Sequence, residues 1–247
     1  QTIHALDDVG FEVRRGECLG LVGESGCGKT TLARMLVGLT PPTDGRIEIN
    51  GTDRRGDSTR RFGRDIQYVF QDPTSSLNPR MTVRDLITEP AFLHAGIGPQ
   101  ERAALASVLL EQVTLERDAA DRYPHQFSGG QRQRLCIARA LSVSPKVIVA
   151  DEAVSALDVS TAARVTQLMQ QLQDDLGIAF LFISHDIAVV ERVSHRIAVM
   201  YQGEIVEIGP TEQVLRSPQH DYTRKLLSAV PVPRPGGRQL NLVPEPA

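Results

Sequence analysis

The spacing of hydrophobic positions changes along the chain and separates predicted strands from predicted helices. Short runs dominated by apolar residues, which are typical of strands buried on both faces of a sheet, occur at residues 18–22, 66–70, 147–150, 178–184 and 197–201. Helical spacing of apolar residues occurs between and after these runs, at residues 31–39, 162–176, 187–193 and 221–229. Strands that alternate with helices in this way predict an α/β fold built on a mainly parallel sheet.

Two parts of the chain depart from this alternation. Near the N-terminus, residues 9–14 alternate apolar and polar side chains, which predicts a half-buried strand, and residues 45–51 predict another short strand. Between residues 72 and 144 the strand signal disappears. Three segments there have helical periodicity instead: 83–95, 100–113 and 130–142. We therefore expect a helical insertion between two strands of the α/β core.

This organisation predicts four units. They are the first part of the core at 1–71, the helical insertion at 72–144, the second part of the core at 145–209, and a C-terminal helix with a Pro-rich tail at 210–247. Within the first unit, residues 53–65 carry five arginines interrupted by three acids, which is typical of a solvated loop. The prolines from residue 230 onward predict an extended tail.

Composition and charge narrow the class of protein. The chain has 247 residues, of which 41% are hydrophobic and 23% charged, as in an ordinary globular protein. Its net charge of −3 is too small to indicate nucleic acid as a partner. No apolar run approaches the roughly 20 residues of a membrane-spanning helix. Cys18, Cys27 and Cys136 lack the spacing of a zinc site, so a reduced cytosolic protein without structural zinc is expected.

A glycine-rich sequence follows the first buried strand. It reads GESGCGKT and matches the pattern G-x-x-x-x-G-K-[ST], with a strand before it and a helix after it. In such a loop backbone N–H groups point at phosphate oxygens, Lys29 reaches the β- and γ-phosphates, and the Thr30 hydroxyl can ligate Mg²⁺. The predicted phosphate-binding residues are Gly23, Glu24, Ser25, Gly26, Cys27, Gly28, Lys29, Thr30 and Thr31.

Two carboxylates end another buried strand. Asp151 and Glu152 follow directly on the apolar residues 147–150. An acidic pair at a strand end is common, but together with the phosphate-binding loop it predicts a site for nucleoside triphosphate hydrolysis. Asp151 would orient the Mg²⁺ water shell, and Glu152 would polarise the attacking water.

A serine and two glycines begin a predicted helix between these two motifs. The residues are Ser128, Gly129, Gly130 and Gln131, after Phe127. The serine is a helix N-cap, and with the glycines it forms a second anion-binding nest. The helix at 130–142 is about 20 Å long and runs toward the strand that ends at Asp151. Since Ser128 then lies a helix length from its own phosphate-binding loop, we expect it to bind a nucleotide held by another subunit.

In this order, the motifs resemble the nucleotide-binding domain of ATP-binding cassette (ABC) transporters over nearly the whole chain. GESGCGKT is similar to the Walker A motif, IVADE to Walker B, and FSGGQ to the family signature, with Phe127 in place of the usual leucine. The resemblance identifies Gln71 with the Q-loop, Asp158 with the D-loop, and His185 with the switch histidine that senses the γ-phosphate. It implies a P-loop NTPase (RecA-like) core with a mainly parallel sheet, N-terminal antiparallel β-strands and an inserted α-helical subdomain.

The resemblance also implies an ATPase with ATP and Mg²⁺ at its site. The implied catalytic residues are Lys29, Gln71, Glu152 and His185, and the implied metal ligands are Thr30, Gln71 and Asp151. Two cassettes would pair head to tail around two ATP molecules. The signature residues Ser128, Gly129, Gly130 and Gln131 would then act in trans, on the ATP of the partner cassette. That second cassette would be a fused half, a paralogue or an identical chain.

Further sequence runs resemble the oligopeptide, dipeptide, nickel and glutathione importer subfamily. They are QDPTSSLNPRMTV, DEAVSALDVS, AVMYQGEIVEIG and SPQHDYTRKLLSAVPVP, with Asp221 where the C-terminal motif usually has proline. The resemblance is strongest to the second ATPase half of glutathione-type or dipeptide-type importers. It implies a location on the cytoplasmic face of the bacterial inner membrane, with two membrane permeases as partners, an extracytoplasmic substrate-binding protein acting indirectly, and no nucleic acid.

The main alternative is a soluble ABC-type ATPase that acts in DNA repair or translation. Only 56 residues separate Gln71 from Ser128, which leaves no room for a long coiled coil, and the zinc cysteine pairs of the repair proteins are absent. The family's adenine-stacking aromatic would precede Gln1, which leads us to expect an excised half of a longer protein.

Overall fold

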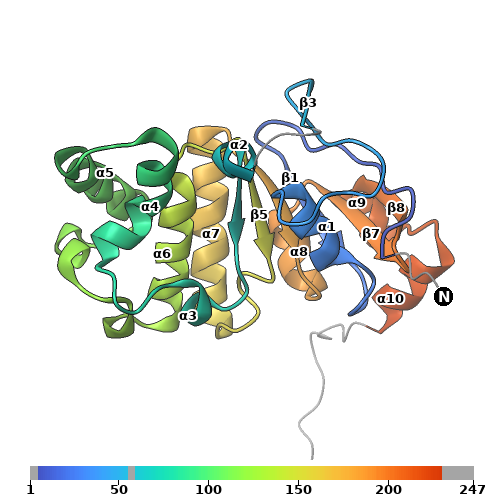
Figure 1. The fold of residues 1–247 in the computed structure, drawn as a ribbon. Helices are drawn as coiled ribbons and strands as arrows, with labels where there is room; N and C mark the ends of the chain where they lie inside the picture. Colours follow the sequence, from blue (N-terminus) through green and yellow to red (C-terminus); the bar gives the residue numbers. More distant parts are fainter. Residues whose placement is uncertain (1–4, 55–58, 230–247) are drawn as a thin grey trace, which may run out of the picture.

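A six-stranded sheet runs through the centre of the computed structural model, which describes residues 5–54 and 59–229 (Figure 1). The strand order is β4-β5-β6-β1-β7-β8; the first five strands are parallel and β8 is antiparallel to β7. The strands are β1 (Cys18–Val22), β4 (Ile66–Val69), β5 (Val147–Asp151), β6 (Ala179–Ile183), β7 (Arg196–Tyr201) and β8 (Glu204–Pro210). The predicted α/β fold with a mainly parallel sheet is confirmed.

Hydrophobic residues cover both faces of the sheet, as the continuous apolar runs predict. In β1, Leu19 and Leu21 belong to the core cluster that includes α1, whereas Cys18 and Val22 belong to the cluster that includes α7 and α8. The helices are α1 (Lys29–Leu36), α7 (Val159–Leu176) and α8 (Ile187–Val193). Side chains alternate between the two faces of a strand, so every residue of β1 is buried.

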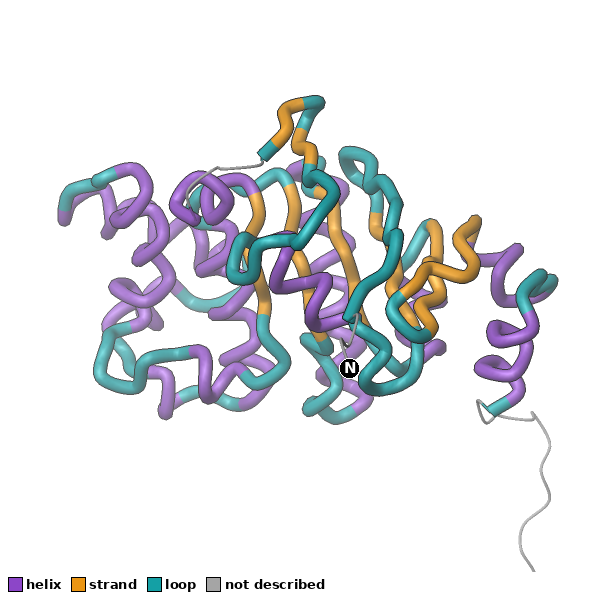
Figure 2. The backbone as a smooth tube through the Cα atoms, turned by 45° about the vertical axis from the view of Figure 1, so that its right-hand side comes forward, coloured by secondary structure: helices purple, strands orange, loops and turns teal. Residues whose placement is uncertain are grey.

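A group of helices lies beside the β4 edge of the sheet (Figure 1, left; Figure 2). It consists of α3 (Pro73–Ser76), α4 (Val83–Ala95), α5 (Pro99–Gln112), two 3₁₀ turns at Arg117–Asp121 and Pro124–Gln126, and α6 (Gly129–Leu141). Fully buried leucine and isoleucine side chains, among them Leu86, Leu109 and Leu135, hold α4, α5 and α6 together. The predicted helices of residues 72–144 are confirmed; the four-unit division of the chain stays a prediction.

The prediction of a strand at residues 9–14 is wrong. Val9, Phe11 and Val13 do pack against the core, as the alternation indicates. However, this segment pairs with no strand in the part of the chain that the structure describes. Alternation reports which side chains face the core, but a strand also needs a neighbouring backbone to pair with. The antiparallel pair of the N-terminal region is instead β2 (Glu48–Ile49) with β3 (Thr52–Asp53).

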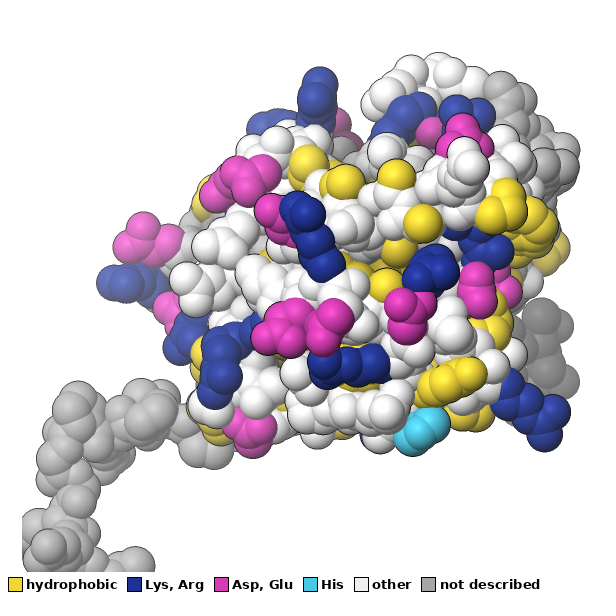
Figure 3. All heavy atoms as spheres, turned by 90° about the vertical axis from the view of Figure 1, so that its left-hand side faces the viewer, with side chains coloured by type: hydrophobic (Ala, Val, Ile, Leu, Met, Phe, Trp, Pro, Cys, Tyr) yellow, Lys and Arg dark blue, Asp and Glu magenta, His cyan; other side chains and the backbone are white. Residues whose placement is uncertain are grey.

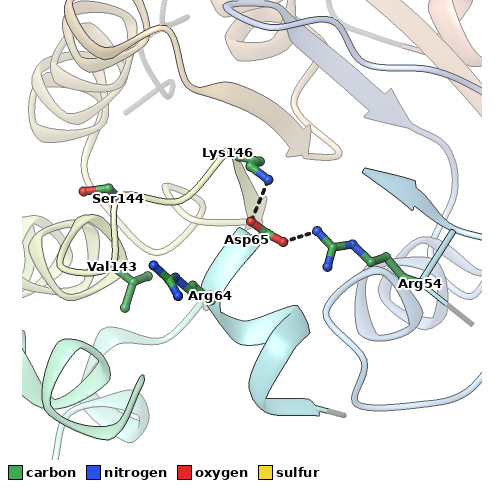
Figure 4. A pocket seen from close by; sticks show the side chains of 6 residues that line it. All are labelled: Arg54, Arg64, Asp65, Val143, Ser144 and Lys146. Carbon is green, nitrogen blue, oxygen red and sulfur yellow. Dashed lines mark hydrogen bonds and ion pairs between the residues drawn. The ribbon is translucent and has the colours of Figure 1, made fainter. Parts of the chain in front are cut away.

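The prediction of a solvated loop at residues 53–65 is also wrong in part. Residues Thr59–Asp65 form a helix, α2, and Arg54 is only 5% exposed. The Arg54 guanidinium pairs with the Asp65 carboxylate, which also accepts from Lys146 Nζ at 2.9 Å (Figure 4). The charges at residues 53–65 do not predict these ion pairs, because Lys146 comes from a distant part of the sequence. Residues 55–58 of the predicted loop lie outside the described residues.

The C-terminal part of the described chain holds α9 (Thr211–Arg216) and α10 (Asp221–Ser228), next to β7 and β8 (Figure 1). The predicted extended tail from residue 230 lies outside the described residues. Within residues 5–54 and 59–229, no helix has the length and apolar character needed to cross a membrane.

Candidate functional site

Four motif residues gather at one edge of the sheet because they end neighbouring parallel strands. Gln71 follows β4, Asp151 ends β5, His185 follows β6, and Gly23 follows β1. These strands lie side by side in the order β4-β5-β6-β1. Carboxyl ends of parallel strands point the same way, so residues that are 162 positions apart in sequence, Gly23 and His185, meet at one edge.

The loop after β1 has the backbone geometry that its glycines predict. Gly26 and Gly28 have φ angles of 82° and 111°, in the region that favours glycine. A Cβ at Gly28 would lie 2.6 Å from the Ala5 carbonyl oxygen, and one at Gly23 would lie 2.2 Å from the Met200 carbonyl oxygen. Glycine is therefore required at Gly23 and Gly28 by close packing against other segments as well as by the turn.

Lys29 lies across its own loop. Its Nζ donates to the carbonyl oxygens of Gly23 at 2.7 Å and Glu24 at 2.8 Å, and the residue is 7% exposed. The ammonium group is thus held over the loop by these two carbonyls. The side chain of Thr30, in the first turn of α1, is exposed.

Asp151 has a partner that the sequence analysis missed. The hydroxyl of Tyr68 in β4 donates to Asp151 Oδ2. Burial raises the pKa of Tyr68, and the hydrogen bond to Asp151 raises it further. The phenol therefore stays protonated and able to donate. Tyr68 lies opposite Val149 in the β4–β5 pairing, and Asp151 is two residues further along. Both side chains therefore lie on one face of the sheet, a relation that needs the strand register to be known.

Glu152 and His185 approach each other across the edge of the sheet. His185 Nδ1 is 3.4 Å from Glu152 Oε1, and the Glu152 side chain is 24% exposed against 64% for His185. The Glu152 backbone is left-handed, with φ 49°, and its N–H donates to the Ile183 carbonyl at 2.9 Å. A strained backbone at a strand end is typical of functional positions.

Gln71 is linked to Glu152 through the side chain of Ser155. Its Nε2 lies 3.4 Å from the Ser155 hydroxyl oxygen, and that hydroxyl donates to the Glu152 carbonyl at 2.9 Å. The Gln71 side chain is exposed. The structure therefore brings together Gln71, Asp151, Glu152, His185 and the loop that holds Lys29.

The serine–glycine motif lies elsewhere, at the start of α6. Ser128 Oγ accepts from the Gln131 N–H at 3.3 Å, and Gln131 Oε1 accepts from the Ser128 N–H at 2.9 Å. This reciprocal cap fixes the first turn of the helix. Ser128, Gly129 and Gln131 are exposed, while Gly130 is buried, and a Cβ on it would lie 2.2 Å from Thr161 Cγ2.

Asp158 caps the adjacent helix, α7. Its carboxylate accepts from the Thr161 N–H at 3.0 Å and from the Ser160 hydroxyl at 2.7 Å. The hydrogen bonds from Ser160 and Thr161 lower the pKa of Asp158. The neighbouring Val159 is 88% exposed. Among the described residues, no hydrogen bond connects Ser128 or Asp158 with the loop at residues 23–30.

A cavity of about 480 Å³ lies at the other end of the sheet, where β4 and β5 begin, and is lined by Arg64, Asp65 and Lys146 among others (Figure 4). On the face formed by the helical end, Lys and Arg side chains are interspersed with Asp and Glu (Figure 3). Among the described residues of that face, neither sign of charge forms a continuous patch.

A glycine-rich loop between a buried strand and a helix, with two carboxylates at the end of a neighbouring parallel strand, defines a P-loop NTPase fold. The chain belongs to the ABC transporter family: that family's model matches residues 6–155, and the model "Oligopeptide/dipeptide transporter, C-terminal region" matches residues 206–246. The resemblance predicted from the motifs is confirmed.

Close relatives are ATP-binding proteins of import systems. The "Glutathione import ATP-binding protein GsiA" of Pectobacterium atrosepticum is 55% identical over 240 residues, and that of Escherichia coli K12 is 55% identical over 238 residues. The alignments cover 96% and 94% of this chain but 38% of each relative, so the chain spans less than half of their length.

Solved ABC structures have the same fold. A dimeric post-hydrolysis structure of the ATP-binding cassette MJ0796 with ADP and Pi has 31% identity and a TM-score of 0.75, with 85% of this chain and 91% of that chain covered. CbiO1 of Clostridium perfringens, part of the transporter complex cbiONQ, has 28% identity and a TM-score of 0.77, with 86% and 84% covered.

Proposed function

We propose that this chain hydrolyses ATP to energise an ABC importer for peptides, of the oligopeptide, dipeptide or glutathione type. The observation that carries the proposal is the gathering of Gln71, Asp151, Glu152 and His185 beside the phosphate-binding loop at one sheet edge. The C-terminal match to oligopeptide and dipeptide transporters and the glutathione-import relatives support the cargo class. The comparisons favour import over the alternative in DNA repair or translation.

In this proposal the loop from Gly23 to Thr31 binds the phosphates of ATP. Lys29 exchanges its two carbonyl partners for phosphate oxygens, a change that needs only rotation of its flexible side chain. The N–H groups of the loop that follow Glu24, and those of the first turn of α1, donate to the same phosphates.

The donor set fits Mg²⁺ as the cofactor. Thr30, Gln71 and Asp151 supply a hydroxyl, an amide and a carboxylate oxygen, and Mg²⁺ takes oxygen ligands from few protein groups together with phosphates and water. Asp151 is only 7% exposed, and Tyr68 occupies one of its oxygens, which orients the carboxylate. When bound, the metal neutralises charge that develops on the β- and γ-phosphates.

Glu152 would act as the general base in hydrolysis. The attacking water gives a proton to the Glu152 carboxylate as its oxygen bonds to the γ-phosphorus, and the bond to the β–γ bridging oxygen breaks, which yields ADP and phosphate. His185, 3.4 Å from Glu152, would donate to the γ-phosphate from the neighbouring strand end. Gln71 and its contact with Ser155 connect this group to the helices that begin at α3.

A second cassette would complete the site. Ser128, Gly129, Gln131 and Asp158 are exposed, and Gly130 lies buried beneath them. Among the described residues none of the five hydrogen-bonds to the loop at residues 23–30, so we assign them to the partner's ATP. The partner cassette is a fused half, a paralogue or an identical chain. Closure around two ATP molecules is lost on hydrolysis because the γ-phosphates bridge both halves.

Transport also needs a membrane pore. We propose that two permeases receive this cassette at the cytoplasmic face of the bacterial inner membrane, with the segment after the Q-loop, residues 72–84, as the docking groove. An extracytoplasmic binding protein would supply the cargo.

The test is reconstitution of the full transporter in proteoliposomes. ATP-dependent uptake of at least one of labelled glutathione, dipeptide or oligopeptide is expected, and it is expected to stop in the absence of Mg²⁺. If the assembled complex hydrolyses ATP but accumulates none of these cargoes, the importer assignment fails. If it does not hydrolyse ATP at all, the ATPase assignment fails too.

Tyr68→Phe tests the proposed metal site. Because the lost hydrogen bond ends on a charged group, worth about 1.5–3 kcal/mol, we expect the Mg²⁺ concentration for half-maximal ATPase activity to rise about ten-fold. The measurement is ATPase rate against free Mg²⁺ at saturating ATP. Tyr123→Phe, which removes a hydroxyl from the helical end of the molecule, is the matched control. An unchanged Mg²⁺ dependence in Tyr68→Phe would remove Tyr68 from the site.

A further inference from the structure

The C-terminal helix contacts the phosphate-binding loop through one tyrosine. Tyr222 in α10 accepts a hydrogen bond at its hydroxyl oxygen from the Glu24 N–H, at 3.1 Å. The two residues are 198 positions apart in the sequence, and Tyr222 is 7% exposed. The sequence of the phosphate-binding loop does not predict this contact, because Tyr222 lies far away in the chain, in the C-terminal region that matches oligopeptide and dipeptide transporters.

One peptide group in the loop is held from both of its sides. The peptide between Gly23 and Glu24 donates its N–H to Tyr222, and its carbonyl oxygen accepts from Lys29 Nζ at 2.7 Å. In the proposed function Lys29 exchanges this carbonyl for a phosphate oxygen. Tyr222 is then the contact that keeps the peptide in its orientation. A glycine at position 23 makes this support necessary, because glycine allows its flanking peptides to rotate most freely.

Tyr222 is itself held firmly. Its ring packs against Tyr201 of β7, with centroids 4.1 Å apart and an interplanar angle of 31°. The start of α10 is tied to β8, since Glu207 accepts from the N–H groups of Gln219 at 2.8 Å and His220 at 3.0 Å. His220 Nδ1 in turn accepts from the Tyr222 N–H at 3.1 Å. The hydroxyl thus has little freedom to move away from Glu24.

The turn between β7 and β8 supports the same loop. The Gly203 N–H donates to the Cys27 carbonyl at 3.0 Å. Gly23 lies against the Met200 carbonyl closely enough to exclude a side chain. The loop is therefore braced on one side by the segment from β7 to α10. Burial raises the pKa of Tyr222, so its hydroxyl stays neutral at physiological pH.

We propose that Tyr222 is a positioning residue for nucleotide binding: it holds the Gly23–Glu24 peptide in the phosphate-binding orientation when Lys29 turns to the nucleotide. This inference rests on the proposed function, because it takes the loop to be the ATP site. It makes the C-terminal region of the chain a part of the nucleotide site. A displacement of α10 would weaken ATP binding through loss of the Tyr222–Glu24 hydrogen bond, without any change in the sequence of the motifs.

Tyr222→Phe is the first test, since it keeps the ring on Tyr201 and removes only the hydroxyl. In the assembled transporter we expect the KM for ATP to rise about five-fold, as for loss of one hydrogen bond, with kcat unchanged. The Kd for MgADP, measured by calorimetry, is expected to rise by the same factor. Tyr201→Phe, which keeps the ring pair but removes the hydroxyl of Tyr201, is the matched control. It is expected to leave the KM for ATP and the Kd for MgADP unchanged.

A second measurement separates positioning from plain stabilisation. If Tyr222 only stabilises the fold, Tyr222→Phe lowers the melting temperature and leaves the KM for ATP and the Kd for MgADP at their wild-type values, and the inference is overturned. A wild-type protein that binds neither ATP nor ADP contradicts the proposed function instead. Tyr222→Leu, which loses ring and hydroxyl, is expected to weaken MgADP binding further; binding equal to wild type in that variant also overturns the inference.

Discussion

Glu152→Gln is expected to lower kcat for ATP hydrolysis by about 10²-fold or more, the range for loss of a general base, while ATP binding stays intact. The amide keeps the size of the side chain but cannot take a proton from water. Because the γ-phosphates persist, two cassettes are expected to remain paired in the presence of ATP. Steady-state ATPase assays and light scattering of the ATP-bound protein with its partner cassette measure the two effects.

A second substitution sharpens this test. Ser128→Arg, added to Glu152→Gln, places a bulky cation where the partner's nucleotide would lie, and the trapped pair is expected to dissociate. Since Ser128 is exposed and its side chain hydrogen-bonds, among the described residues, only within its local cap, the fold should tolerate the change. ATPase activity near the wild-type rate in Glu152→Gln, in a preparation shown to pair, would contradict the assignment of Glu152.

Lys29→Ala is expected to raise the Kd for MgATP about 30-fold or more, in line with the loss of charge-assisted hydrogen bonds, and to abolish measurable hydrolysis. The removed ammonium also leaves the Gly23 carbonyl without this donor, whereas the Glu24 carbonyl keeps the Cys27 N–H at 3.4 Å. Calorimetric titration with MgATP gives the affinity.

Lys146→Ala is the control for charge removal. Lys146 is one of the three lysines of the chain and pairs with Asp65 at the opposite end of the sheet. Its replacement is expected to leave the Kd for MgATP unchanged. Equal affinities in Lys29→Ala and wild type would show that the loop from Gly23 to Thr30 is not the phosphate site.

Local motifs made much of the candidate site predictable. The phosphate-binding loop, the acidic pair at Asp151 and Glu152, and the cap at Ser128 depend on residues close in sequence, where a short pattern specifies both backbone and chemistry. Parallel-strand topology then brings Gln71 and His185 to the same edge, because equivalent ends of alternating strands meet there. Continuous apolar runs likewise identified the buried strands.

Local sequence patterns gave wrong predictions where contacts with distant parts of the chain decide the structure. The alternation at residues 9–14 correctly showed which side chains pack on the core, but strand formation depends on a pairing partner that the alternation does not reveal. The arginines at 53–65 suggested solvation, but Arg54 is buried because Asp65, held near Lys146 at the starts of β4 and β5, neutralises it. In each case the deciding contact comes from another element.

The sequence by itself determined the class of this protein, its family and most of the residues that we assign to ATP, since those reside in contiguous motifs. Only the tertiary structure decided how these residues are supported. Tyr68 meets Asp151 through the register of β4 with β5, and Tyr222 meets Glu24 through the docking of α10. Strand register and helix docking are set by packing over the whole domain, so no local pattern encodes them.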